Sequence, residues 1–194
     1  MLDILFSPLE AIARAKKEKN VIKTFVALFV ASVSSSIFSL NLAKYFGHKY
    51  AIMGVTFGGA LLLTIIIAFL LELCMNILTP GGGYYEAITS LSYSFFIMST
   101  GLLISFLIGW IPKHNKYIAL FTMIISISVL LVTCTLSSAV LLRAVTALFQ
   151  TNLLTAIIAL SIVYSAVFLA LYLFALKNIL ASYGMLSLTP SIRI

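Results

Sequence analysis

Five long apolar stretches, joined by short polar connections, restrict most strongly what this chain can fold into. We expect them as helices at residues 21–46, 50–78, 86–111, 116–142 and 152–180. About 20 helical residues cross the roughly 30 Å hydrocarbon layer of a bilayer, so each stretch is long enough to span it. Composition agrees, because 62% of the 194 residues are hydrophobic and only 9% are charged, whereas about a quarter are charged in soluble domains. The sequence therefore predicts an all-α, polytopic integral membrane protein with a five-transmembrane-helix bundle.

Residues 1–20 precede the first span and are predicted to form an amphipathic helix at the membrane interface. Ser7 is a suitable N-cap, Pro8 suits the first helical position, and Glu10 completes an S-x-x-E capping box. The residues expected on one apolar face are Leu5, Phe6, Leu9, Ile12 and Ala13. The predicted organisation is this interfacial segment, a transmembrane domain over residues 21–180 and a tail over residues 181–194.

Basic residues cluster just before and at the start of the first span. The cluster consists of Arg14, Lys16, Lys17, Lys19 and Lys23. The positive-inside rule then places the N-terminus in the cytoplasm, and five spans place the C-terminus on the opposite side. The formal net charge of +7 favours anionic lipid headgroups as partners of this cluster. Nucleic acid is not expected as a partner, because the basic residues flank spans instead of forming one stripe.

Residue types that support catalysis or metal binding are scarce. Asp3 is the single aspartate, and His48 and His114 lie in different connections, so neither an aspartyl pair nor an H-E-x-x-H helix is present. Cys74 and Cys134 lie within spans and form no C-x-x-C motif. The glycine run lacks the G-K-[ST] of a phosphate-binding loop. We therefore expect no enzyme activity, no metal and no cofactor.

Polar residues inside the spans leave two hypotheses open. Glu72 lies within the second span with Asn76 one turn further, and Arg143 at the end of the fourth span is expected to extend towards Glu72. The first span adds a polar series at helical spacing, namely Ser32, Ser35, Ser36, Ser39 and Asn41. A transporter or channel would gather these groups around a water-reachable cavity, whereas a scaffold would bury them in a dry seam between helices.

Small residues predict where helices pack closely. Gly54 and Gly58 form a G-x-x-x-G motif in the second span, and Gly101, Ser105 and Gly109 form a small-residue stripe on the third.

The connection before the third span is rich in glycine. Pro80 is expected to end the second helix, and Glu86 is expected at the positive N-terminal end of the third helix dipole. The stretch is either a tight turn or a docking surface, made by Gly81, Gly82, Gly83, Tyr84, Tyr85 and Glu86.

The stretch "LSYSFFIMSTGLLISFLIGWIP" (residues 91–112) resembles the third span of the Yip family, the Ypt- and Rab-interacting membrane proteins. The matching positions are Tyr93, Ser94, Phe96, Ile97, Trp110, Ile111 and Pro112. Ser7 and Pro8, and the glycine run before the third span, are similar to features of the short prokaryotic members. Ser92 and the pair Ser99-Thr100 stand where eukaryotic members usually carry glycine and proline.

This resemblance implies five spans, a cytoplasmic N-terminus and a non-enzymatic role in membrane organisation or trafficking. It implies an adaptor that acts through contacts with a membrane protein, with a second copy or with lipids, and a small GTPase is a partner by resemblance only. The competing hypothesis is a transporter or channel for a small solute, ion or lipid, built around Glu72 and the polar first span.

Overall fold

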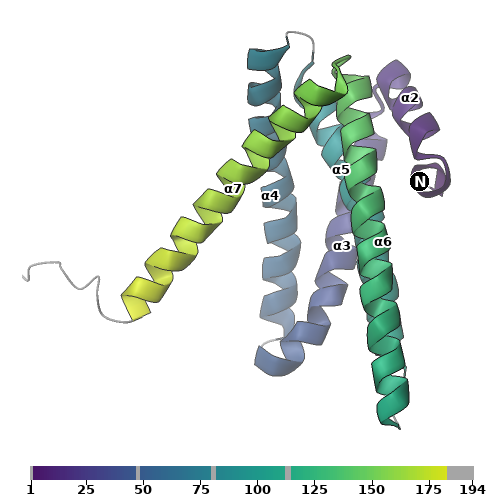
Figure 1. Cartoon of the computed structure of the whole chain (residues 1–194), viewed down its shortest axis with the longest axis vertical. Helices are drawn as coiled ribbons and strands as arrows, with labels where there is room; N and C mark the ends of the chain where they lie inside the picture. The colour runs from purple at the N-terminus through teal and green to yellow at the C-terminus, as the bar shows by residue number, and fades with distance from the viewer. Residues whose placement is uncertain (1, 47–48, 80–81, 112–114, 183–194) are drawn as a thin grey trace, which may run out of the picture.

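The computed structural model describes residues 2–46, 49–79, 82–111 and 115–182, which form seven helices (Figure 1). The helices are α1 (Leu2–Phe6), α2 (Pro8–Glu18), α3 (Val21–Phe46), α4 (Lys49–Leu78), α5 (Tyr84–Gly109), α6 (Lys116–Leu148) and α7 (Leu153–Ser182). The last five of these are long and apolar enough to cross a membrane. The predicted all-α, multi-pass membrane protein is confirmed.

The span boundaries agree with the predicted ones to within two residues, except at the end of α6. That helix ends at Leu148, six residues later than expected. Its buried positions recur at spacings of three and four, through Ser137, Leu141, Ala144 and Leu148, so its packed face continues beyond residue 142. Arg143 accordingly lies inside the helix on its exposed side, and not at the start of a connection.

The centre of the bundle is α5, which packs against α3, α4 and α6. More than half of its most apolar window is buried inside the protein, the largest share of any span. By contrast, α7 contacts α4 and α6, and its buried residues Ala156, Ala159, Leu160 and Val163 lie in its first half. In Figure 1, α7 diverges from the other spans towards its C-terminal end.

Hydroxyl groups lie in the seams between these helices. The Thr24 and Thr89 hydroxyls join α3 to α5 at 3.1 Å, and the Ser94 and Ser137 hydroxyls join α5 to α6 at 2.8 Å. The serines of α3 are buried and donate to carbonyls of their own helix, as Ser32 does to Leu28. The serine series therefore lies in an interhelical seam, the structural alternative left open by the sequence.

The two predicted glycine motifs differ in outcome. A Cβ on Gly101 would lie 2.1 Å from the Thr133 Oγ1 atom, so this glycine lets α5 approach α6 closely. Ser105 of the same stripe is buried and donates to the Ser126 carbonyl at 3.3 Å. Gly109 is half-buried at the last position of α5.

The G-x-x-x-G prediction for α4 is wrong within this chain. A Cβ on either Gly54 or Gly58 would meet nothing within 4 Å, so no described residue packs against them. The motif lies on a side of α4 that neighbouring helices leave uncovered.

Candidate functional site

The N-terminal segment covers one end of the bundle, where the N-terminus of α5 and the C-terminus of α6 lie. Both α1 and α2 contact α5, and α2 also contacts α6 (Figure 1). The residues that this docking buries are Ile4, Ala11, Ile12 and Ala15. The face predicted for the membrane is therefore only partly correct, because Ile12 is buried in the protein while Phe6 and Leu9 are 82% and 63% exposed. The segment is docked on protein through one face and leaves a second, smaller apolar surface free.

The predicted capping box at Ser7 does not form. Ser7 precedes α2 and Pro8 is its first residue, as expected, but the Ser7 side chain makes no capping hydrogen bond. The reason is that α1 runs directly into α2, with the Ser7 amide donating to the Asp3 carbonyl at 2.9 Å. The Ser7 backbone (φ −140°, ψ 62°) consequently departs from the usual extended N-cap conformation. Glu10 instead forms an ion pair with Arg14 at 3.5 Å.

Asp3 connects the N-terminal segment to the first span. The Lys23 ammonium donates a hydrogen bond to its carboxylate, and an Arg14 guanidinium nitrogen lies 3.7 Å from the same oxygen. The hydrogen bond from Lys23 holds the pKa of the Asp3 carboxyl far below its usual range. Sequence reasoning missed this role of Asp3, although a lone aspartate close to a basic cluster is a signal for such a pair.

Lys19 connects the same segment to the start of α5. Its ammonium lies 3.1 Å from one carboxylate oxygen of Glu86 and 6.0 Å from the centroid of the Tyr85 ring. The other Glu86 oxygen accepts the Gly83 amide at 3.0 Å, so Glu86 caps the helix N-terminus as expected. Lys19 has a left-handed backbone (φ 44°) and ends α2 with its own amide on the Ala15 carbonyl.

Gly82 brings the same stretch against the connection between α6 and α7. A Cβ on Gly82 would lie 2.0 Å from the Phe149 ring, and that ring is buried. Residues 82–86 are all half-buried. The candidate docking surface is thus occupied on one side by Lys19 of the chain itself and on the other by Phe149. Gly81, Pro80 and Pro112 lie outside the described residues.

Four basic side chains, of Arg14, Lys16, Lys17 and Lys19, are exposed on the docked segment. Arg14 is paired with carboxylates of its own segment, whereas neither Lys16 nor Lys17 has an ion-pair partner in the part of the chain that the structure describes. With Lys19 they form a positively charged surface, which we call the cationic cap (residues 14, 16, 17 and 19). Lys23 of the predicted cluster is half-buried and donates a hydrogen bond to Asp3. It therefore fixes the docked segment to α3 and is not part of the cap.

The tyrosine–serine pair of the third span lies in the interior. Tyr93 is 1% exposed on α5, the central helix of the bundle. Ser94 is buried and exchanges hydrogen bonds with Ser137 of α6. Both residues therefore pack the interior of the bundle, and Ser94 does so in the seam between α5 and α6.

The polar residues predicted to act together inside the membrane do not come together in the structure. Glu72 is half-exposed and Asn76 exposed on α4, and Arg143 is exposed on α6. No ion pair or hydrogen bond links Glu72 to another described residue, so the expected approach of Arg143 is not observed. None of the three lines the cavity described next.

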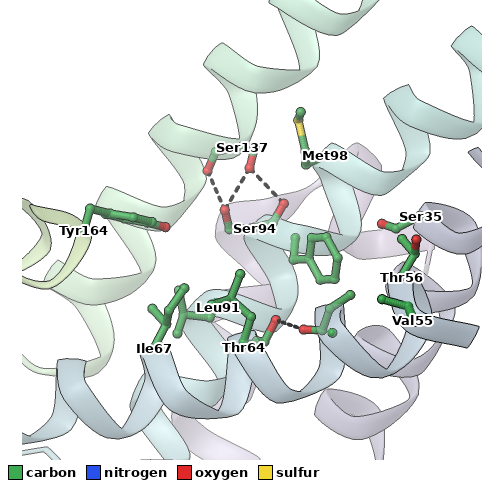
Figure 2. Close-up of a pocket in the computed structure, with 14 residues that line it drawn as sticks. Ser35, Val55, Thr56, Thr64, Ile67, Leu91, Ser94, Met98, Ser137 and Tyr164 are labelled. Atoms are coloured by element: carbon green, nitrogen blue, oxygen red, sulfur yellow. Dashed lines mark hydrogen bonds between the residues drawn. The ribbon is translucent and has the colours of Figure 1, made fainter. Parts of the chain in front are cut away.

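A cavity of about 490 Å³ lies deep in the membrane-spanning part of the bundle (Figure 2). All five spans contribute a hydroxyl-bearing residue to its wall: Ser35, Thr64, Ser94, Ser137 and Tyr164. Thr56 of α4 adds a sixth hydroxyl, and the remaining wall is apolar and carries no charged residue. Val55, Leu63 and Tyr164 line it and are themselves exposed, so it opens on the lipid-facing surface beside α4 and α7.

The two cysteines are free thiols on different helices, α4 and α6. Cys74 is half-buried with its sulfur 3.9 Å from the Ala159 carbonyl, and Cys134 is exposed on α6. Within the described ranges, no three histidine, cysteine or acidic side chains come together as metal ligands.

No protein-family model matches the sequence, and no curated protein or solved structure is significantly similar to the chain. The resemblance to the Yip family stays a prediction.

Proposed function

We propose that this protein is a non-enzymatic membrane-organising adaptor of Yip type, which binds an anionic surface of a membrane-protein partner through its cationic cap. The observation that carries the proposal is the docking of the basic segment on the bundle. Ile4 and Ile12 anchor it, its own Asp3 pairs with Lys23 of α3, and its Lys19 pairs with Glu86 of α5. Among the described residues, the Lys16 and Lys17 ammonium groups have no ion-pair partner. A rigidly held cationic surface loses little conformational freedom on binding, which favours affinity.

The geometry gives less support to the transport hypothesis in its original form. Glu72 and Asn76 do not line the cavity, and the serines of α3 donate to their own helix. A path for ions or polar solutes needs polar groups directed at a shared channel, because charges are costly inside the bilayer.

The test is affinity purification of the full chain from native membranes in mild detergent after brief crosslinking. The decisive variant is Lys16→Glu with Lys17→Glu, which reverses the charge of exposed side chains that make no ion pair. The matched control is Lys116→Glu with Lys177→Glu. Both residues are exposed and lie away from the cap, Lys116 at the first position of α6 and Lys177 near the C-terminal end of α7.

We expect the wild type and the control to recover one partner at fixed stoichiometry and the cap variant to lose it. A small GTPase among the recovered proteins would support the partner class implied by the resemblance. Recovery of the protein alone from all three samples would contradict the adaptor function.

A further inference from the structure

The cavity among the spans offers one hydrogen-bond donor in an otherwise satisfied wall. Ser35, Thr56 and Thr64 donate to carbonyls of their own helices, and Ser94 and Ser137 bond to each other. These five hydroxyls are therefore already paired, and a ligand gains little from them.

Tyr164 differs from the other hydroxyl residues of the cavity. Its ring extends from α7 towards Leu91 and Ser94, with the hydroxyl at the leading end (Figure 2). That hydroxyl has no hydrogen-bond partner among the described residues, although it borders a largely apolar space. A phenol in such a place is the group that a ligand with one acceptor oxygen would satisfy.

Depth in the membrane restricts what can supply that oxygen. Tyr164 is the twelfth of the 25 residues of its span (164 − 153 + 1), and Ser94 is the eleventh of 26 in its own (94 − 84 + 1). Both therefore lie near the middle of the hydrocarbon layer, where water is scarce. A phosphate headgroup at the membrane surface is about half the roughly 30 Å layer away, and a charged group is disfavoured at this depth.

We propose that the cavity binds one molecule of an uncharged lipid, whose hydrocarbon chain fills the space and whose hydroxyl or carbonyl oxygen accepts a hydrogen bond from Tyr164. The volume of about 490 Å³ is within the range of small-molecule sites, roughly 300–1,000 Å³. The opening beside α4 and α7 gives a bilayer lipid direct lateral entry. This proposal does not depend on the adaptor function.

The test uses the purified full chain in lipid nanodiscs and a diazirine-bearing long-chain alcohol as probe. We expect photolabelling to concentrate on the peptides of α4, α5 and α7 that line the cavity, and to be competed by the unlabelled alcohol. A probe with the same chain and a carboxylate head should label these peptides at least fivefold less.

Two variants with matched controls test the geometry. Gly59→Leu should reduce cavity labelling about tenfold, because Gly59 lines the cavity and a Cβ there meets nothing within 4 Å. Gly54→Leu is its control, since Gly54 is equally unobstructed on the same helix but does not line the cavity. Tyr164→Phe should weaken competition by the alcohol about fivefold, the equivalent of one hydrogen bond, and Tyr172→Phe on the same helix should not.

Labelling spread evenly over the exposed helix faces, and unaffected by the competitor, would overturn the proposal. Equal labelling by the carboxylate probe would overturn the assignment to an uncharged lipid. Photocrosslinks between two copies at the cavity would assign it to self-association instead. If a variant fails to fold, competition between the unlabelled alcohol and the probe in the wild-type protein still tests whether the cavity binds the alcohol.

Discussion

At the scale of single residues, the effect of replacing a glycine on stability depends on which side chain faces it. Gly101 lies against Thr133 of α6, whereas Gly58 has open space on its side. We predict that Gly101→Ala destabilises the fold by about 1–3 kcal/mol, because the added methyl group forces α5 and α6 apart. Gly58→Ala should be neutral or stabilise by up to about 1 kcal/mol through helix propensity. Thermal unfolding in mild detergent measures both.

Equal melting temperatures for these two variants would contradict the packing of α5 on α6. The sequence marks both glycines as small residues at helical spacing, but it does not say which one meets a neighbour. That information lies in the rotation of each helix about its axis, which is set by the whole bundle.

A second residue-scale prediction concerns pH and Asp3. Its pKa is lowered in the folded state by the hydrogen bond from Lys23, so the carboxylate stabilises the docked segment above the unfolded pKa of about 3.9. That contribution should stay constant from neutral pH down to about pH 5 and be lost as the pH falls further towards the folded pKa. Hydrogen exchange of residues 2–18 against pH measures it.

Asp3→Asn is the control for this pH dependence. The variant should show weaker protection of residues 2–18 at neutral pH and no loss that depends on a carboxylate. Wild-type protection that rises on acidification would contradict the role of Asp3.

At the scale of elements, the docking of α2 raises the question of which contacts hold it. Ile12 is 2% exposed between α2 and the bundle, whereas the Lys19 side chain is 66% exposed in its ion pair with Glu86. We predict that Ile12→Ala costs about 2–5 kcal/mol of local opening free energy and that Lys19→Gln costs less than about 1 kcal/mol. Hydrogen exchange of residues 8–18 gives both values.

A larger effect from Lys19→Gln than from Ile12→Ala would show that charge holds the segment. The position of the α2 start at Pro8 followed from local sequence signals. Its docking surface did not, because α2 packs against α5 and α6, and α6 ends six residues later than the sequence predicts. Local signals describe one helix, whereas docking depends on two segments distant in the sequence.

At the scale of the whole molecule, the five spans were predictable because lipid requires about 20 apolar residues for each crossing. The cavity was not predictable, since its wall combines residues of five helices that are distant in the sequence. The serine series of α3 was a partial signal, and Ser35 is its member in that wall.

The prediction at this scale concerns membrane topology, that is, the side of the membrane on which each connection lies. With five crossings, Ala13 and Gln150 should lie on one side of the membrane and Trp110 on the other. The cluster of basic residues predicts that the first side is cytoplasmic. Cysteines introduced singly at these positions, with Cys74 and Cys134 replaced by serine, should react with a membrane-impermeant maleimide accordingly in sealed cells and in inverted vesicles. Labelling of all three from the same side would contradict the five-span arrangement.

The length of α6 has a consequence for the bilayer around it. Its 33 residues rise about 50 Å at 1.5 Å per residue, against a hydrocarbon layer of roughly 30 Å. Only 6% of its most apolar window is buried in the protein. The apolar side chains of that window are therefore expected to contact lipid. The helix must tilt or stretch the surrounding bilayer, and each ångström of hydrophobic mismatch costs a fraction of a kcal/mol. A thicker bilayer lowers that cost, so we expect α6 to tilt less in a thick bilayer than in a thin one.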